Sequence, residues 1–135
     1  MNPLFHELFQ NTRFIYKELN NALKEHELFA AQWTIIYCIQ LKGEITMKQI
    51  CNYINVEAPT VTRTVSRLVE LGWLTTIEGI DRRERIVQLS EEALTKLSRI
   101  KETIIQFENR FLEVLTEEEQ LVLMGLLKKM NKEGQ

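Results

Sequence analysis

The sequence predicts a mainly α-helical fold that contains a single β-hairpin. Only 5 glycines and 2 prolines occur among the 135 residues, which favours long helices over an all-β chain. Apolar residues recur at helical spacing in several segments, and a hairpin pattern is found at residues 74–89. No linker, repeat or low-complexity tract divides the chain, so we expect one domain over residues 1–135.

The first two helices are predicted from apolar spacing and from a glycine stop. Residues 3–26 carry leucine, isoleucine and aromatic side chains near i, i+4 and i+7 spacing, which is typical of an amphipathic helix. This apolar stripe is broad for one helix on a small core, so it indicates a partner surface. A second helix is predicted over residues 30–42, ended by Gly43. Its inward side chains are expected to be Trp33, Ile36, Tyr37 and Leu41.

Residues 46–72 are predicted to form two short helices joined by a tight turn. Thr46 and Gln49 fit a capping box at the start of the first helix, and residues 55–57 make the turn. Pro59 is placed at the first position of the second helix, where proline is favoured, and Gly72 ends that helix. Its core-facing positions follow i, i+4 and i+7 spacing and are Val61, Val65 and Leu68. Its opposite face carries Pro59, Thr60, Arg63, Ser66, Arg67 and Glu70, with Thr62 at the edge.

The hairpin that follows completes a winged helix-turn-helix pattern. Its strands are expected at residues 74–78 and 85–89, with the turn near residues 79–81. Three arginines, Arg82, Arg83 and Arg85, lie at or beside the tip. The order and spacing of helix pair and hairpin therefore predict a two-stranded wing beside the second helix.

Two further helices are predicted at the carboxyl end of the chain. Ser90 can cap a helix that runs to about residue 115, a length of about 39 Å. Thr116 and Glu119 form a second capping box, which opens a final helix with Leu123, Leu127 and Met130 on one side. The longer helix carries a heptad seam made of Ala93, Leu97, Ile100, Ile104, Phe107, Phe111 and Val114.

The terminal helices are expected to form a dimerisation region. A 39 Å helix is longer than a small winged-helix domain needs, so packing of residues 3–26 against residues 97–130 of a second copy accounts best for the excess apolar surface. Burial of the seam against the protein's own helices is the alternative. We expect dimerisation helices at about 3–26 and 90–132 and a homodimer.

Duplex DNA is the partner that the middle of the chain predicts. Arginine can bond the edge of guanine, threonine can contact a base edge or a thymine methyl group, and an arginine on a ribbon can enter the narrow minor groove. A solvated helix face and a surface salt-bridge cluster are the alternatives. Asp81 could hold the guanidinium of Arg83 in a fixed pose. The candidate DNA-binding residues are Thr46, Lys48, Pro59, Thr60, Thr62, Arg63, Ser66, Arg67, Arg82, Arg83 and Arg85.

The charge balance argues against strong non-specific affinity for DNA. The whole chain has a net charge of −2, and residues 42–90 hold seven basic and six acidic side chains. Non-specific affinity depends on neutralised phosphates, so binding should rely on a few placed arginines and on two copies of the domain. A winged-helix module that binds another protein, without strong DNA binding, is the second hypothesis.

Other classes of function are disfavoured. His6 and His26 stand alone, no nucleophile–base pair or phosphate loop is present, and we expect neither metal, cofactor nor enzymatic activity. Cys38 and Cys51 are too few for a disulfide framework and are expected to pack as inert thiols in a reducing cytoplasm. No run of 18 apolar residues and no signal-peptide pattern is found, so no membrane association is expected.

Several of these motifs together resemble the MarR family of bacterial winged-helix transcriptional regulators. The resemblance includes Gln32-Trp33 and residues 43–46, 60–63 and 68–74. Its most specific part is a D-x-R wing pattern, Asp81 to Arg83, followed by a return strand that ends in Leu89-Ser90. It implies that residues 59–71 form the recognition helix, that Arg83 enters the minor groove and that Asp81 orients it. The DNA-binding lobe would span about residues 30–90.

The resemblance also implies a mechanism. The protein is expected to be a ligand-responsive repressor that binds a near-palindromic operator as a homodimer. A small-molecule effector would bind between the dimerisation helices and the DNA-binding lobe and change the spacing of the recognition helices. The candidate cleft residues are Phe9, Arg13, Tyr16, Trp33 and Tyr37, any of which could instead belong to the core.

Overall fold

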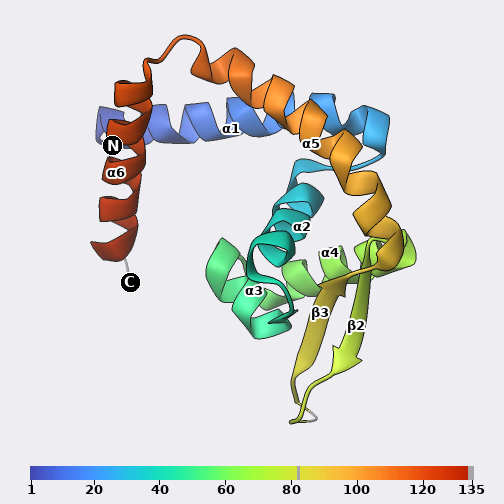
Figure 1. The fold of residues 1–135 in the computed structure, drawn as a ribbon. Helices are drawn as coiled ribbons and strands as arrows, with labels where there is room; N and C mark the ends of the chain where they lie inside the picture. The colour runs from blue at the N-terminus through green and yellow to red at the C-terminus, as the bar shows by residue number, and fades with distance from the viewer. Residues whose placement is uncertain (82, 134–135) are drawn as a thin grey trace.

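The computed structural model describes residues 1–81 and 83–133, and in this part of the chain it has six α-helices and three short strands (Figure 1). The elements are α1 (Pro3–Leu23), the single 3-10 turn η1 (Lys24–His26), α2 (Ala30–Lys42), β1 (Ile45–Thr46), α3 (Met47–Ile54), α4 (Ala58–Glu70), β2 (Leu74–Glu78), β3 (Arg85–Leu89), α5 (Glu91–Leu112) and α6 (Glu117–Glu133). The predicted winged helix-turn-helix fold is confirmed.

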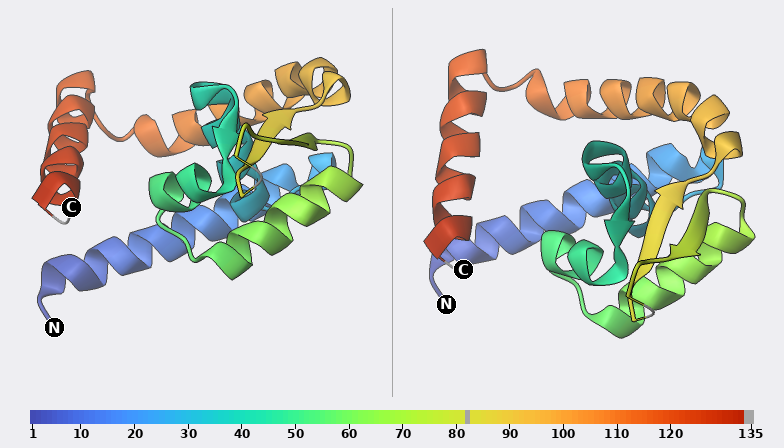
Figure 2. Two further views of the ribbon diagram at one scale, coloured as in Figure 1. Left: turned by 90° about the horizontal axis from the view of Figure 1, so that it is seen from below. Right: turned by 60° about the horizontal axis from the view of Figure 1, so that its bottom comes forward.

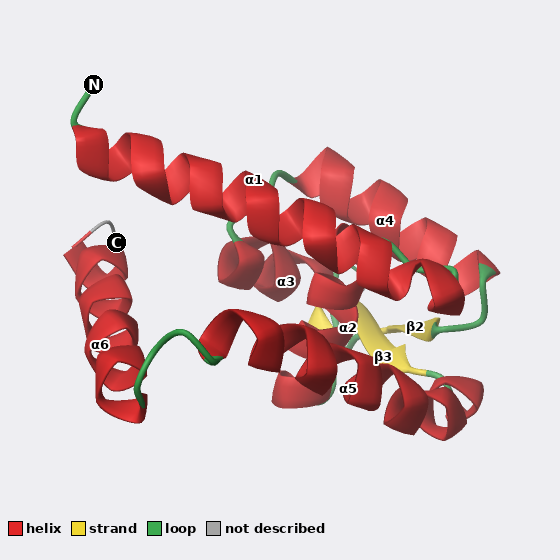
Figure 3. Ribbon diagram, turned by 90° about the horizontal axis from the view of Figure 1, so that it is seen from above, coloured by secondary structure: helices red, strands yellow, loops and turns green. Residues whose placement is uncertain are grey.

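The helices divide the molecule into two sides with α2 between them. Figure 1 shows α1 and α5 on one side of α2, and α3, α4 and the hairpin gathered on the other; seen from above in Figure 3, α2 lies between α1 and α5. Helix α6 stands apart from the rest of the chain at the end of α5, which both views of Figure 2 show. No helix among residues 1–81 and 83–133 is long and apolar enough to cross a membrane.

The small sheet has a strand that the sequence pattern did not predict. Its order is β1-β3-β2, with both pairings antiparallel. Ile45 and Thr46 pair with Val87 and Ile86, so the residue that caps α3 also belongs to the sheet. Two residues are too few to show alternation, which is why β1 escaped prediction. This strand attaches the start of the helix pair directly to the wing.

One apolar core joins α1 to α5 and the sheet. Its fully buried side chains include Leu23 of α1, Ile36 of α2, Leu68 of α4, Val87 of β3 and Ile100 of α5. The predicted inward positions of α4 are all buried. No described residue of α6 contributes to this core. The position of α4 relative to the hairpin is therefore determined by the same packed interior.

Two of the inward positions predicted for α2 are wrong. Trp33 and Ile36 are buried, but Tyr37 is 49% and Leu41 is 55% exposed. The buried positions instead include Ile35 and Cys38. Most of the 13 residues of α2 are apolar, and its few polar residues do not gather on one face, so the spacing of apolar residues cannot select the buried side.

The heptad seam of α5 packs largely inside its own chain. Of the seven seam residues, Ala93, Leu97, Ile100 and Phe107 are buried, and Ile104 and Phe111 are half-buried. Phe111 meets Phe14 of α1 edge to face, with ring centroids 5.8 Å apart. Val114 is exposed because α5 ends at Leu112 rather than near residue 115. The expectation that this seam serves a second copy is therefore wrong for its buried positions, which α1 and the core already cover.

Candidate nucleic-acid interface

Helix α4 presents its polar face because its apolar face is buried. Val61, Val65 and Leu68 fill the core, and Pro59 lies in the first turn, where a missing N–H costs nothing. The predicted contact residues on the other face, Pro59, Thr60, Thr62, Arg63, Ser66 and Arg67, are all exposed. A long polar side chain on this face is free to reach a ligand without disturbing the fold.

Helix α3 begins with the predicted capping box. The backbone N–H of Gln49 donates to Thr46 Oγ1 at 3.1 Å, and Gln49 Oε1 accepts from the N–H of Thr46 at 2.9 Å. Asn55 ends the helix in the left-handed region at φ 59°, which a short polar side chain tolerates. Thr46 is half-buried and Lys48 is exposed in the first turn. Local interactions therefore define both ends of α3, including the end at Asn55 from which the turn to α4 begins.

Arg67 on the exposed face of α4 is paired with an acidic residue. Its Nη1 donates to Glu70 Oε2 at 3.0 Å, and both side chains are largely exposed. Arg63 forms no ion pair with any residue that the structure describes. Sequence reasoning placed Glu70 on this face and gave it no role, although its i+3 spacing from Arg67 was the available signal. The two arginines of α4 therefore differ in how free their guanidinium groups are.

The hairpin tip is shaped by Asp81. Its carboxylate accepts from the backbone N–H of Arg83 at 3.1 Å, and its carbonyl accepts from the N–H of Glu84 at 2.8 Å. The expected pairing of Asp81 with the guanidinium of Arg83 is absent among the described ion pairs, because the carboxylate turns to the nearer backbone. Asp81 thus supports the tip through its backbone. Arg83 and Arg85 are exposed, and Arg82 lies outside the described residues.

Gly79 near the tip lies close to Glu84 of the opposite strand end. A Cβ at Gly79 would lie 3.0 Å from Cβ of Glu84, and the N–H of Gly79 donates to the carbonyl of Glu84 at 2.9 Å. A side chain at this position would therefore require Glu84 to shift by a few tenths of an ångström where the strands enter the turn.

Ser90 ties the end of α4 to the start of α5. Its hydroxyl donates to the carbonyl of Gly72 at 2.6 Å and accepts from the N–H of Ala93 at 3.0 Å. Its backbone N–H donates to the carbonyl of Trp73 at 3.0 Å. Gly72 has φ +86°, in the region that favours glycine. The end of α4, the hairpin and α5 are therefore held at one joint.

These elements lie on a single side of the molecule. Figure 1 shows α3, α4 and the hairpin on the side away from α1 and α5, with the hairpin tip projecting farthest. The described basic side chains of this side are Lys48, Arg63, Arg67, Arg83 and Arg85, all of them exposed. Exposed acidic residues, including Glu57 and Glu78, lie among them. The surface is thus a set of separate cations rather than a continuous basic patch.

The five residues of the expected effector cleft lie on two helices, with Phe9, Arg13 and Tyr16 on α1 and Trp33 and Tyr37 on α2. Phe9 contacts Phe5 of its own helix, with ring centroids 6.3 Å apart, and Trp33 contacts Tyr37 of its own helix at 6.4 Å. Phe9, Arg13, Tyr16 and Tyr37 are exposed, whereas Trp33 is only 8% exposed and belongs to the core. Trp33 therefore has a packing role, and the cleft stays a prediction.

The two cysteines differ in environment. Cys38 is completely buried in α2, and burial raises the pKa of its thiol above the ordinary value, although Lys42 acts in the opposite direction. Cys51 is half-buried in α3. Among residues 1–81 and 83–133, no group of three or more His, Cys, Asp or Glu side chains is arranged to hold a metal ion.

Comparison with solved structures identifies the same architecture elsewhere. A mutant of MarR from E. coli, solved in complex with operator DNA, matches with a TM-score of 0.87 at 24% identity, over 96% of this chain and 94% of that one. A MarR family transcriptional regulator from Silicibacter pomeroyi matches with a TM-score of 0.88 at 25% identity, over 97% and 89%.

Sequence relatives agree with the structural neighbours. A sequence model of the MarR family matches residues 28–84. The HTH-type transcriptional regulator YwoH of Bacillus subtilis is 40% identical over 116 residues, which are 86% of this chain and 85% of the relative. The HTH-type transcriptional regulator PecS of Dickeya dadantii is 30% identical over 87% of this chain and 74% of its own. The chain belongs to the MarR family of DNA-binding, winged helix-turn-helix transcriptional regulators.

Proposed function

We propose that the protein is a cytoplasmic, homodimeric and ligand-responsive repressor, without catalytic activity, that binds a near-palindromic DNA operator. The observation that carries this proposal is the presence of an exposed Thr/Arg face on α4 and an exposed arginine-bearing hairpin on one side of the chain. In this proposal residues 30–90 bind DNA, and residues 3–26 and 90–132 form the dimer. The operator complex of its E. coli structural neighbour supports the choice of DNA as partner.

Each DNA-facing element has a role that its chemistry suits. Helix α4 lies in the major groove, where Arg63 and Arg67 bond base edges or phosphates and the hydroxyls of Thr60, Thr62 and Ser66 make shorter contacts. The wing places Arg83 in the minor groove, where the narrow width strengthens the negative potential. Arg82 and Arg85 support it from the same tip, and Asp81 holds the backbone of the tip. Thr46, Lys48 and Pro59 lie near the phosphates.

A second copy of the chain covers apolar surface that one copy leaves open. Leu121 of α6 is 75% exposed, and Leu126 and Leu127, between one and two helical turns further along α6, are also exposed. Phe5 and Phe9 extend this apolar surface on α1. An exposed helix with this many large apolar side chains is costly in water and typical of an interface. A two-fold dimer would place the two copies of α4 about 34 Å apart, one helical turn of DNA.

The ligand response depends on the distance between the two recognition helices. An effector changes DNA affinity only if it binds the DNA-competent and the incompetent arrangement with different affinity. Such a ligand would act at the junction of the dimerisation helices and the DNA-binding lobe, where Phe9, Arg13, Tyr16 and Tyr37 are exposed.

DNA binding is tested by selection followed by a salt series. Duplexes selected from a random pool should contain two related half-sites, and the logarithm of affinity should fall linearly with the logarithm of salt concentration. Arg83→Ala should weaken binding about ten- to hundredfold, since two copies of the contact are lost in a dimer. The matched control is Arg110→Ala, which removes an exposed arginine of α5. A weak affinity that salt and Arg83→Ala leave unchanged would favour a protein partner instead.

A further inference from the structure

The tip of the hairpin carries an apolar side chain where a turn residue is expected. Ile80 lies just after the end of β2 and before Asp81, in the part of the hairpin that Figure 1 shows projecting farthest from the core. Ile80 is fully exposed, and no other large apolar side chain in the described part of the chain is as exposed. Turns are usually built from Gly, Pro, Asn, Asp or Ser, which suit a tight bend. The fold of the chain therefore gives no reason for isoleucine at this position.

Hydrogen bonds hold the tip in one shape. The N–H of Gly79 donates to the carbonyl of Glu84 at 2.9 Å, and the N–H of Glu84 donates to the carbonyl of Asp81 at 2.8 Å. The Asp81 carboxylate accepts from the N–H of Arg83 at 3.1 Å. These bonds close the turn that contains Ile80. A side chain carried on a preordered turn binds at a lower cost in conformational entropy than one on a flexible loop.

The partner of Ile80 is the partner of the wing, because one turn carries both Ile80 and Arg83. Arg83 is exposed three residues after Ile80, and the chain belongs to a family of DNA-binding regulators. Proteins that bind the minor groove often insert an apolar side chain, isoleucine among them, between two base pairs. Glu78 and Glu84 are exposed beside the tip and weaken its attraction to phosphates. A contact that does not depend on charge suits such a tip.

We propose that Ile80 is a minor-groove wedge, a side chain that enters the groove beside Arg83 and partly unstacks one base-pair step of the operator. This inference deepens the proposed function and rests on it, because it requires the wing to lie in the minor groove.

The wedge gives the protein a preference for deformable DNA. Arg83 alone favours stiff A-tracts, whose minor groove is narrow, whereas a wedge favours pyrimidine–purine steps such as TA and CA, which unstack easily. The two residues of the tip therefore predict opposite sequence preferences. The preferred step at the wing reports which of them dominates.

The first test uses duplexes that the full chain selects from a random pool. These duplexes should carry a TA or CA step at a fixed distance from each half-site. Replacing each adenine in turn with 2-aminopurine, whose fluorescence rises on unstacking, locates the step that the wing opens. Binding of the parent protein should raise the fluorescence at that step, and binding of Ile80→Ala should not. Changing the step from TA to AA should weaken the parent about tenfold and leave Ile80→Ala unaffected.

The second test compares variants on one selected duplex. Ile80→Ala should lower affinity about tenfold, since apolar contact is lost from both copies of the chain. It should leave the slope of log affinity against log salt unchanged, whereas Arg83→Ala should make that slope shallower. Ile80→Leu should retain most of the affinity and the fluorescence rise. Because Ile80 is fully exposed, Ile80→Ala should unfold at the temperature of the parent. Ile105→Ala, the same substitution at an exposed position of α5, is the matched control and should change neither affinity nor fluorescence.

Three results would overturn the wedge. They are an affinity that Ile80→Ala leaves unchanged, a fluorescence rise that persists in Ile80→Ala, and a loss of affinity that comes with a shallower salt slope, which would trace the effect to a displaced Arg83. In each of these cases DNA is bound, so the proposed function stands and only the role of Ile80 fails. If the parent protein selects no duplex, the proposed function fails and the wedge fails with it.

Discussion

The joint at Ser90 provides a quantitative test of how the end of α4 is held in place. Its hydroxyl accepts from the N–H of Ala93, which caps α5, and donates to the carbonyl of Gly72, at the end of α4. Ser90→Ala removes both hydrogen bonds and leaves the space that the hydroxyl filled. Because Ser90 and Gly72 are half-buried, water replaces the lost partners only in part.

The expected cost follows from the two bonds. Loss of an N-cap costs about 1 kcal/mol, and an underpaired, half-buried carbonyl adds about 1 kcal/mol. Ser90→Ala should therefore lower the free energy of unfolding by about 2 kcal/mol. For a domain of this size, each kcal/mol lowers Tm by about 4 °C, so Tm should fall by about 8 °C.

Urea denaturation followed by circular dichroism measures this change at one fixed protein concentration, since a dimer unfolds in a concentration-dependent manner. Ser90→Asp keeps a cap acceptor but cannot donate to Gly72, and should recover no more than about half of the loss. Ser98→Ala, on an exposed position of α5, serves as the control. If the free energy of unfolding of Ser90→Ala lies within about 0.5 kcal/mol of the parent value, the two hydrogen bonds of Ser90 do not stabilise the fold as argued.

Three further outcomes are expected. Glu70→Gln should strengthen DNA binding about two- to fivefold and steepen its salt dependence, because it frees the guanidinium of Arg67 and removes an anion from the interface; unchanged affinity in an electrophoretic titration would contradict this. Burial raises the pKa of the Cys38 thiol, which lowers its thiolate fraction at every pH below that pKa, so iodoacetamide at neutral pH should label Cys51 in the folded protein and Cys38 only after unfolding, as read by mass spectrometry. Leu127→Lys on the exposed face of α6 should convert a dimer of about 32 kDa into the 16.0 kDa chain in light scattering, and a dimer that persists would remove α6 from the interface.

Sequence reasoning succeeded where the deciding interaction is local. The bounds of α2 and of both hairpin strands agree with the prediction, and the capping boxes at Thr46 and Thr116 form as expected. The buried side of α4 was also predictable, because its apolar and polar residues separate cleanly onto two faces. In each case the signal lies within a few residues of the element it defines.

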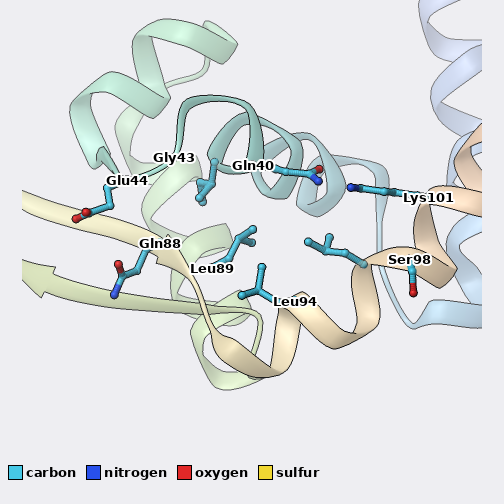
Figure 4. A pocket seen from close by; sticks show the side chains of 10 residues that line it. Gln40, Gly43, Glu44, Gln88, Leu89, Leu94, Ser98 and Lys101 are labelled. Atoms are coloured by element: carbon cyan, nitrogen blue, oxygen red, sulfur yellow. The ribbon is translucent and has the colours of Figure 1, made fainter.

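The errors occurred where a choice depends on distant parts of the chain. The apolar α2 has no polar face, so only its packing against α3, α4 and β3 decides that Tyr37 points outward. Asp81 is a local exception, because its carboxylate accepts from the backbone N–H of Arg83, two residues away, and the D-x-R pattern does not distinguish that partner from the guanidinium. The pocket lined by Gln40 of α2, Leu89 of β3 and Lys101 of α5 unites residues of three elements, and no motif brings them together (Figure 4).

The boundaries of α2, β2 and β3, the capping residues and the polar face of α4 were determined by the sequence alone, because they follow from backbone hydrogen bonding and from side-chain periodicity. The tertiary structure decided which apolar stripe is already covered within one chain. Helix α1 and the core cover most of the heptad seam of α5, whereas the apolar residues of α6 stay exposed. The tertiary structure also decided that β1 joins the wing to α3. Both outcomes depend on contacts between residues far apart in the chain, and the free energy of such contacts cannot be inferred from a local sequence pattern.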